Sequence, residues 1–490
     1  MRDQYEPVIG LEVHAELNTR SKMFCACPVV DATQAPPNTA VCPVCAGMPG
    51  TLPVVNQQAV EQALRVALAL DCTIAPQSVF ARKNYFYPDL PKGYQISQYE
   101  FPLAQYGHLA ILTGRGEEAI RITRVHLEED TGKLTHMHND ENYSLVDLNR
   151  AGVPLLEIVS EPDLHSVEAV RAYASTLRTL LRYLGVNSGD MEKGVIRFEA
   201  NVSVRRSGAT TLGTRVEIKN LNSFRALERS VTYEIQRQTE LVRKGGMVRQ
   251  ETLGWNETDE VTFSQRGKEE AHDYRYFPEP DLPPLVVEQE WVERIKAGMP
   301  ELPQVKLQRL RSQYSLSPYD TQLLVEDQAV AAYFEDVLAA GPALAPKSVA
   351  NWMLGDLFSL MNQAGISIKE LRISPAGLAE LLEMTAQGQI NTSTAKTVLG
   401  EMASSGEPAG PIITRRGFGQ ISDSSQIASL AAQVLEQNPN EVASYLAGKE
   451  TVAQFFFGQV MRLAQGQANP QVVRAELARQ LEALKARNQD

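Results

Sequence analysis

The stretch VIGLEVHAEL, residues 8–17, alternates between apolar and polar side chains from Leu11 to Leu17. Successive side chains of a β-strand point to opposite faces, so this pattern predicts a strand with one buried and one polar face. The polar face carries Glu12, His14 and Glu16. Two carboxylates and an imidazole in one row could hold a hard cation or polarise a phosphate, or they could simply face solvent.

Four further segments before residue 290 show related patterns. The predicted strands are 121–130, 155–159, 195–205 and 214–220, and the predicted helices of this region are 56–70, 166–184 and 223–244. Short strands with few helices between them indicate an α+β domain with an antiparallel sheet, and not a regular alternation of strands and helices.

These strands carry a set of acidic and amide side chains. The candidates are Glu128, Glu129, Glu157, Glu199, Asn201 and Glu217. Glu157 lies in an apolar run and must be paired or bound to a cation, because an unpaired buried charge is too costly. Strands that contribute acids, Asn and Arg to one face predict a metal–phosphate site on the sheet, with a solvated face as the alternative. Glu128 and Glu129 are neighbours, so both reach one site only if the strand ends or bulges there.

The familiar phosphate-binding loops are absent from the sequence. There is no GxxxxGK[ST] motif, and Gly114-Arg115-Gly116 lacks the third glycine of a dinucleotide fingerprint. An ATP site in this chain would therefore depend on a metal ion and a floor of carboxylates.

Four of the five cysteines form a CxC…CxxC set. Cys25 and Cys27 are followed, after a loop, by Cys42 and Cys45. Close pairs separated by a loop can bring four thiolates to a tetrahedral zinc ion, and all four positions are filled, which favours a structural site. Two disulfides are the alternative. Cys72 ends an apolar helix and is expected to pack in the core.

A helical pattern replaces the strand pattern from about residue 290. Prolines between 278 and 303 mark the crossing, and the predicted helices are 320–340, 346–364, 376–387 and a final set within 422–487. The predicted domains are a first domain at 1–292, a helical domain at 293–407 and a helical tail at 408–490. The overall expectation is one sheet domain followed by two all-α domains.

Composition limits the class of protein. The 490 residues carry a net charge of -12, which argues against binding nucleic acid through a general positive field, although a local basic face remains open. No apolar stretch approaches the length of a membrane span, and residues 1–10 lack the pattern of a signal peptide. We expect a soluble, cytoplasmic protein without membrane contact.

Several long motifs, in order along almost the whole chain, resemble one known family. They are VIGLEVHAEL, RKNYFYPDLPKGYQISQ, HLEEDTGK, VDLNRAGVPLLEIVSEPD, EIKNLNSF, DYRYFPEPD and QGQANPQ. The chain is similar to the B subunit of the glutamyl/aspartyl-tRNA amidotransferases.

The resemblance implies a reaction and partners. The B subunit binds ATP and Mg²⁺ and phosphorylates the side-chain carboxylate of glutamate or aspartate on misacylated tRNA(Gln) or tRNA(Asn). Ammonia from an amidase A subunit then displaces the phosphate, giving Gln-tRNA(Gln) or Asn-tRNA(Asn), and a small C subunit completes a heterotrimer. This is an ATP-dependent carbon–nitrogen ligase with glutamine as amido donor, and the sequence shows no Ser-Ser-Lys amidase apparatus of its own.

The resemblance also implies roles for single residues. The Mg²⁺ ligands carried over are Glu12, His14, Glu128 and Glu129, which with Glu199 form the catalytic set; Glu157, Asn201 and Glu217 are second choices for ligands or substrate contacts. Glu199 stands where the family often has aspartate, which lengthens the side chain by one bond. Lys83 and Lys92 fall in the segment expected near the ammonia entrance.

Fold and tRNA contacts follow from the same resemblance. The four cysteines match the zinc-bearing branch of the family, and the first domain is expected to form an antiparallel cradle of the glutamine synthetase type. The tail is expected to grip the tRNA body. The candidates for phosphate contacts are Lys396, Arg415, Arg416 and Arg462, with solvated helix charges as the alternative reading.

Two other functions compete with this one. A free-standing amide ligase of the glutamine synthetase kind would not need the long helical tail. A zinc-stabilised tRNA-binding adaptor without catalysis of its own would leave the acidic sheet face merely solvated.

Overall fold

The computed structural model describes residues 4–137, 143–266, 274–418, 424–464 and 468–487. The chain divides into two compact units, Met1–Val305 and Lys306–Asp490. In their described residues, the first unit combines a large sheet with helices and the second is helical. Of the motif residues, Asp273 and residues 465–467 lie outside the described residues.

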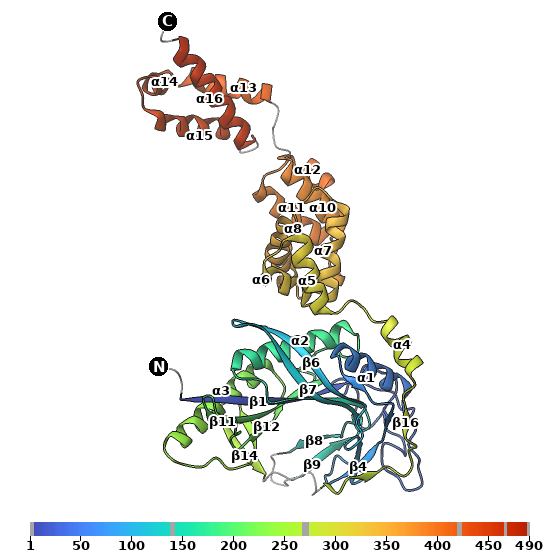
Figure 1. Cartoon of the computed structure of the whole chain (residues 1–490). Helices are drawn as coiled ribbons and strands as arrows, with labels where there is room; N and C mark the ends of the chain where they lie inside the picture. The colour runs from blue at the N-terminus through green and yellow to red at the C-terminus, as the bar shows by residue number, and fades with distance from the viewer. Residues whose placement is uncertain (1–3, 138–142, 267–273, 419–423, 465–467, 488–490) are drawn as a thin grey trace. The chain divides into compact units, whose positions relative to one another are not determined.

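A sheet of nine strands forms the centre of the described part of the first unit (Figure 1). Its strands are β1 (Tyr5–Glu16), β2 (Thr73–Ile74), β6 (Ala104–Thr113), β7 (Gly116–Glu129), β10 (Pro154–Ser160), β11 (Ile196–Arg206), β12 (Val216–Leu221), β13 (Thr252–Asn256) and β14 (Val261–Arg266). They lie in the order β14-β13-β12-β11-β1-β10-β7-β6-β2. The five strands predicted from the sequence are confirmed, and they are consecutive neighbours from β12 to β7.

The sheet is antiparallel except at one pair. β12 and β13 run parallel, so the expectation of an antiparallel sheet is wrong at this position. Helix α3 (Phe224–Arg243) connects these two strands. A helical crossover returns the chain in the same direction, whereas a tight hairpin reverses it.

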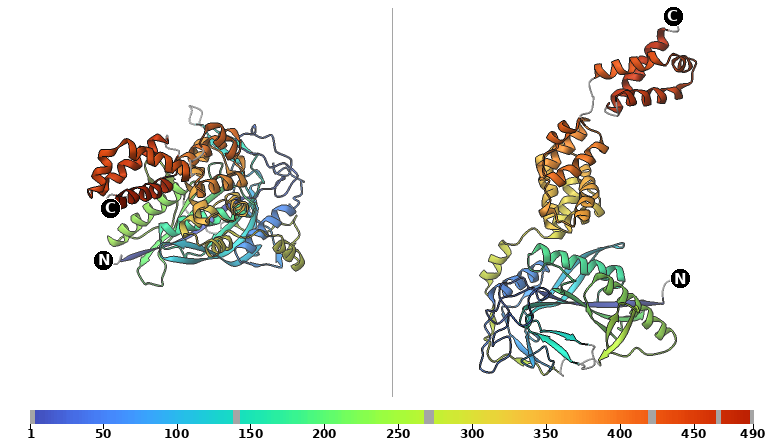
Figure 2. Two further views of the ribbon diagram at one scale, coloured as in Figure 1. Left: turned by 90° about the horizontal axis from the view of Figure 1, so that it is seen from above. Right: turned by 180° about the vertical axis from the view of Figure 1, so that it is seen from behind.

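Helices α1 (Gln57–Ala69), α2 (Val167–Tyr183) and α3 lie on one face of the sheet (Figure 1 and the right view of Figure 2). Their N-cap residues are Asn56, Ser166 and Ser223 respectively, and the side chain of each accepts a hydrogen bond from a backbone N–H of the first helical turn. The apolar side of β1 is fully buried in the core that these helices share. The polar side of the same strand therefore faces away from the helices.

Smaller elements complete the first unit. They are β3 (Gln77–Ser78), β4 (Ala81–Asn84), β5 (Tyr94–Ser97), β8 (Lys133–His136), β9 (Ser144–Asp147), β15 (Phe277–Pro278), β16 (Leu285–Val286) and α4 (Gln289–Ala297). They form the small sheets β15-β4-β5, β16-β3 and β8-β9, and α4 adds Val292 and Ile295 to the core. Figure 1 shows β8 and β9 on the side of the large sheet away from α2.

The second unit is built from helices. They are α5 (Pro303–Tyr314, which begins in the first unit), α6 (Pro318–Val325), α7 (Gln328–Ala340), α8 (Pro346–Trp352), the π-helix η2 (Met353–Leu357), α9 (Phe358–Ala364), η3 (Ile368–Glu370), α10 (Pro375–Ala386), α11 (Thr392–Ser405), α12 (Ala409–Arg416), α13 (Ser424–Gln437), α14 (Pro439–Leu446), η4 (Glu450–Val452), α15 (Ala453–Leu463) and α16 (Pro470–Arg487). The prediction of a single helix at 320–340 is wrong. Helix α6 ends before Asp327, and the side chain of Asp327 caps the next helix, α7.

The apolar residues of the second unit form two separate clusters. The first extends from Leu316 to Ile413 and the second from Ile427 to Leu481. Helix α12 contributes Ile412 to the first cluster. The domain boundaries drawn from the sequence stay predictions.

Candidate active site and metal centre

Strand pairing places several of the predicted residues in rows across the sheet. His14 of β1 is the direct partner of Glu157 on β10, and Glu157 is the direct partner of His126 on β7. Glu12 is the direct partner of Glu199 on β11. These side chains lie on the face away from the helices, so four strands that are distant in sequence build one polar surface.

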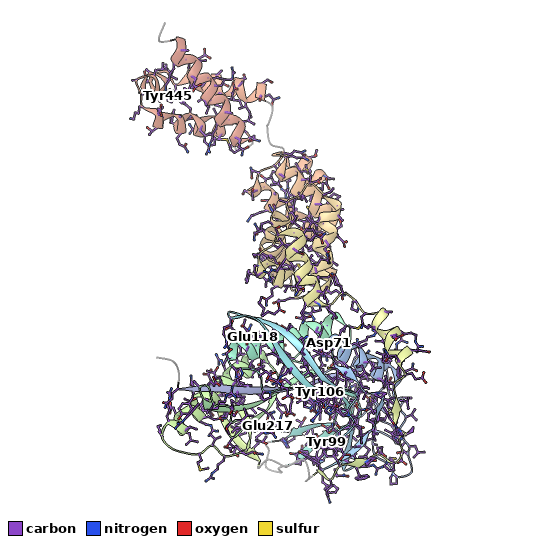
Figure 3. The ribbon with its side chains drawn as sticks, in the orientation of Figure 1. Asp71, Tyr99, Tyr106, Glu118, Glu217 and Tyr445 are labelled. Atoms are coloured by element: carbon purple, nitrogen blue, oxygen red, sulfur yellow. The ribbon has the colours of Figure 1, made fainter. Side chains whose placement is uncertain are left out.

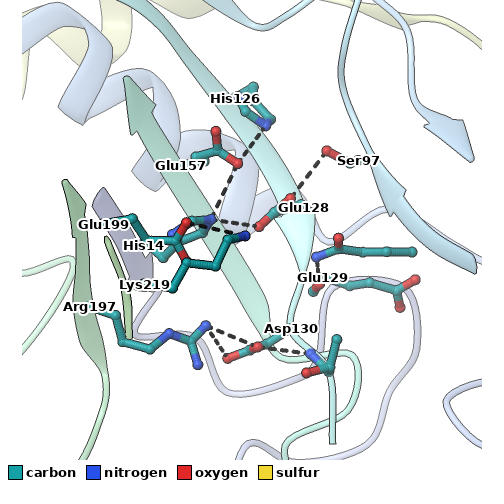
Figure 4. A network of polar contacts seen from close by, with 12 residues as sticks. His14, Ser97, His126, Glu128, Glu129, Asp130, Glu157, Arg197, Glu199 and Lys219 are labelled. Carbon is teal, nitrogen blue, oxygen red and sulfur yellow. Dashed lines mark hydrogen bonds and ion pairs between the residues drawn. The ribbon is translucent and has the colours of Figure 1, made fainter. Parts of the chain in front are cut away.

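The first cluster on this face contains His14, Glu128 and Glu157 (Figure 4). The Nε2 atom of His14 lies 3.3 Å from Oε2 of Glu157 and 3.5 Å from Oε1 of Glu128. His126 Nε2 lies 3.4 Å from the same oxygen of Glu157. Ser97 donates a hydrogen bond of 3.2 Å to Glu128. The prediction that Glu157 is paired or ligating is confirmed, because it is paired.

Electrostatic interactions in this cluster favour the charged forms of His14 and Glu157. Burial opposes the charge of His14, but the hydrogen bond and charge of Glu157 and the charge of Glu128 outweigh it and raise the pKa of His14 to about 9. Burial also acts to raise the pKa of Glu157, yet His126 and His14 hold it well below its usual range. A protonated imidazole thus stands between carboxylates, where a divalent cation could take the place of its proton.

The second cluster contains Glu12, Glu199 and Glu217, which offer carboxylate oxygens within 4.8 Å of one another. Glu217, labelled in Figure 3, comes from β12. Asn201 donates a 2.8 Å hydrogen bond to Glu12. The ammonium of Lys219 lies 3.5 Å from Glu199 and 3.9 Å from Glu217. The strands therefore bring the catalytic candidates Glu12 and Glu199 together with Glu217, one of the second-choice residues. Asn201, another of them, contacts Glu12.

Burial and neighbouring carboxylates act on Glu12 in the second cluster. Burial, followed by the charges of Glu157, Glu199 and Glu217, raises the pKa of Glu12. The Oδ1 atom of Asn201 is buried without a hydrogen-bond partner among the described residues. Both observations fit a bound cation, and a set that consists of oxygen ligands suits Mg²⁺.

Glu129 lies apart from both clusters. Its carboxylate forms an ion pair with Lys92 and accepts a 3.0 Å hydrogen bond from the backbone N–H of Ile96. Gln95 donates to its backbone oxygen at 2.6 Å. Neighbouring strand residues point to opposite faces, so β7 directs Glu128 toward His14 and Glu129 toward Lys92.

A group of ion pairs borders the first cluster at the end of β7. Asp130 accepts hydrogen bonds of 3.1 Å from Arg197, the direct cross-strand partner of His14, and lies 3.5 Å from Arg150. Despite burial, these two arginines lower the pKa of Asp130. Burial and the charge of Asp130 raise the pKa of Glu16 to about 8. The group holds Arg197 in place beside the cluster.

His126, Lys219 and Asp130 were not assigned to the site from the sequence. A usable signal was present for the first two, because His126 and Lys219 stand two positions from Glu128 and Glu217 and therefore share their faces. Asp130 follows the last residue of β7, where the alternation of a strand no longer predicts the direction of a side chain. Lys83, expected near an ammonia entrance, lies on β4 with its Nζ 5.1 Å from the ring centre of Tyr274.

The four cysteines Cys25, Cys27, Cys42 and Cys45 come together as one group. All four are free, and their sulfur atoms lie within 4.8 Å of one another. Cys45 Sγ is 3.8 Å from that of Cys42 and 3.9 Å from that of Cys27. A tetrahedral zinc ion with Zn–S bonds of about 2.3 Å separates its sulfurs by about 3.8 Å, so the residues fit zinc. Cys72 is buried in the core, as expected.

The tRNA candidates lie on exposed helix surfaces and have protein partners. Lys396 lies 2.8 Å from Asp356. Arg415 lies 2.6 Å from Glu407, and Arg416 lies 2.8 Å from Glu401. Arg462 donates a hydrogen bond to Gln459. A phosphate contact at the first three positions would have to compete with a carboxylate.

Among the described residues, no helix is both long and apolar enough to cross a membrane.

Comparison with known proteins places the chain in a family. The GatB/GatE catalytic domain matches residues 7–293, and the GatB domain matches residues 332–481. The B subunit of the aspartyl/glutamyl-tRNA(Asn/Gln) amidotransferase of Thermodesulfovibrio yellowstonii is 51% identical over 96% of this chain and 98% of its own. The protein of the same name from Myxococcus xanthus is 50% identical over 97% of this chain and 98% of its own. The chain therefore belongs to the family of B subunits of the aspartyl/glutamyl-tRNA(Asn/Gln) amidotransferases.

Proposed function

We propose that this chain activates the side-chain carboxylate of Glu-tRNA(Gln), Asp-tRNA(Asn) or both with ATP, and amidates it with ammonia supplied by an amidase partner. The carboxylate oxygen attacks the γ-phosphorus of ATP and ADP leaves. Ammonia then attacks the acyl carbon, its nitrogen loses a proton, and phosphate leaves. A cradle of the glutamine synthetase type, an A and a C subunit as partners and a cytoplasmic location belong to the same proposal.

One observation carries the proposal: two carboxylate clusters lie side by side on the sheet face away from the helices. Glu12, Glu199 and Glu217 would hold Mg²⁺, and His14 with Glu128 and Glu157 would hold a second cation or border the phosphates. A bound magnesium ion neutralises charge that develops during phosphoryl transfer.

Cationic side chains around the clusters suit an anionic substrate. Lys219 already lies beside Glu199, and Arg124 lies 3.7 Å from Glu157 with a buried Nε that has no partner among the described residues. Such groups can bind phosphate or carboxylate oxygens without moving far. Arg415, Arg416 and Arg462 of the tail, together with Lys396 of the preceding helical domain, would contact the tRNA backbone.

The test is phosphate release from γ-labelled ATP. The chain is assembled with its A and C subunits and given Mg²⁺ with Glu-tRNA(Gln) or Asp-tRNA(Asn). Release should depend on charged tRNA and fall at least about 100-fold in Glu128→Gln, since a charge that positions or neutralises phosphoryl transfer is lost. Glu118→Gln, on the same strand but in the β6–β7 hairpin, serves as the control.

Three other results would each contradict part of the proposal. Release that Glu128→Gln leaves unchanged would mean that other carboxylates serve the reaction. Activity on free glutamate without tRNA would support the free-standing ligase. Binding of tRNA without any phosphate release would support the adaptor.

A further inference from the structure

The cysteine group contains a buried cation that no sequence motif pointed to. Lys22 is completely shielded from solvent and is among the largest fully buried side chains of the chain. Its ammonium donates hydrogen bonds to the backbone oxygens of Ala40 at 2.8 Å and of Leu148 at 3.2 Å. The third neighbour is the Sγ atom of Cys45, at 3.6 Å.

Lys22 lacks the usual partner of a buried lysine. Among residues 4–137, 143–266, 274–418, 424–464 and 468–487, the partners of its ammonium are two backbone oxygens and the Cys45 sulfur, and no carboxylate lies within ion-pair distance. Carbonyl oxygens satisfy its N–H groups but do not compensate its charge. Burying an ammonium without a compensating charge costs several kcal/mol of folding free energy, which a single small domain can rarely tolerate. The sulfur of Cys45 is therefore the group that must carry the opposite charge.

The four sulfur atoms also need a neighbouring positive charge. Four thiolates around one divalent cation carry a net charge of about two negative units. Such a centre is itself expensive to bury, and nearby donors are needed to disperse its charge. Cys45 receives two: the Lys22 ammonium and the backbone N–H of Cys42, at 3.1 Å. Neutral thiols or two disulfides would leave Lys22 without compensation.

Lys22 also joins the two halves of the cysteine group. Its backbone N–H donates to the oxygen of Cys27 at 2.9 Å, within the turn that carries Cys25 and Cys27. Its side chain reaches the segment of Ala40 and Cys45 and the end of the β8–β9 hairpin at Leu148. One residue thus contacts both cysteine pairs and ties them to the sheet domain.

We infer that Lys22 is the built-in counter-charge of a four-thiolate, divalent-metal centre, and that it sets how tightly the metal is held. This inference rests on the zinc centre proposed from the four cysteines. It assigns Lys22 a positioning role at the metal centre and none in phosphoryl transfer.

The test measures zinc affinity, with no use of amidation activity. Folding of the full chain is followed over a series of buffered free zinc concentrations in wild type, in Lys22→Met and in Lys133→Met, an exposed lysine of β8. Lys22→Met keeps most of the side-chain volume but removes the charge. It should raise the zinc concentration at the folding midpoint by about 10- to 100-fold, and Lys133→Met should leave it unchanged.

The outcomes separate this inference from the zinc centre itself. Zinc bound equally by wild type and Lys22→Met would overturn the role of Lys22 and leave the metal centre intact. A wild-type chain that binds no zinc would overturn both. If Lys22→Met folds at no zinc concentration, Lys22→Arg decides: restored zinc binding supports a role for charge, and a defect equal to that of Lys22→Met overturns it.

Discussion

The Nε2 atom of His14 lies 3.3 Å from Oε2 of Glu157, and the two residues are direct partners across β1 and β10. The same oxygen of Glu157 is shared with His126. One buried carboxylate therefore holds an imidazole on each side, and it fixes the orientation of the ring that borders Glu128.

Glu157→Gln should impair catalysis more than folding. The amide keeps the shape and one hydrogen-bond acceptor, but it removes the negative charge that orients both imidazoles. We expect turnover on charged tRNA to fall by about 10- to 100-fold, with a normal circular dichroism spectrum. Wild-type turnover in Glu157→Gln would show that this charge is not needed.

Glu129→Gln should impair folding more than catalysis. The carboxylate binds Lys92 and the N–H of Ile96 and lies apart from the first and second clusters. Its loss should lower the free energy of unfolding of the first unit by about 1–3 kcal/mol, because the partly buried cation of Lys92 loses its partner. Turnover at a temperature where the variant is folded should stay within a few-fold of wild type. Turnover as low as in Glu128→Gln would instead place Glu129 among the metal ligands.

Gly47→Ala should destabilise the cysteine region through a steric clash. Gly47 has φ +68°, and an added Cβ would lie 2.8 Å from Cγ and 3.0 Å from the backbone nitrogen of Lys92. The matched control is Gly50→Ala, which has φ +84° but open space around the new Cβ. Gly50→Ala should cost about 1 kcal/mol for backbone strain alone, and Gly47→Ala clearly more. Thermal unfolding compares the two, and equal losses would contradict the clash.

Cys42→Ser should affect the first unit and spare the tail. Losing one of four thiolates weakens a structural metal centre and the fold that depends on it. We expect a lower unfolding temperature for the sheet unit with unchanged tRNA binding by the helical tail, measured by filter binding. Equal loss of both properties would show that the units depend on each other.

A pH effect is expected in the second unit, from Glu335. The hydrogen bond and charge of Arg309, together with Lys306, outweigh burial and lower the pKa of Glu335. A lowered folded-state pKa adds stability that is complete above the unfolded value of about 4.3 and is lost as pH falls through the folded value. Both partners are partly exposed, so the contribution is about 1 kcal/mol or less.

Hydrogen exchange in α7 tests this pH effect. At about pH 7, Glu335→Gln should exchange faster than wild type, and the difference should shrink as the pH falls through the lowered folded-state pKa of Glu335, because wild type then loses the charge as well. Asp336→Asn, at the next and exposed position, is the control. A difference that persists in acid would assign the effect to packing.

Alternation of polar and apolar residues was enough to predict the five central strands, their buried faces and most of the acidic side chains that share the other face. It also predicted that Glu157 must be paired, since a charge within an apolar run has few alternatives. The spacing of the cysteines predicted their grouping. The strand features depend on neighbours within one strand, where the period of the backbone sets the direction of each side chain.

Which side chains meet was decided by the pairing of strands that are far apart in the sequence. The register of β1 against β10 and β11 joined His14 to Glu157 and Glu12 to Glu199. The charge at Lys22 found its partner in Cys45 only through the folding of a loop. Register and loop closure arise from packing of the whole core, and a local pattern cannot specify them.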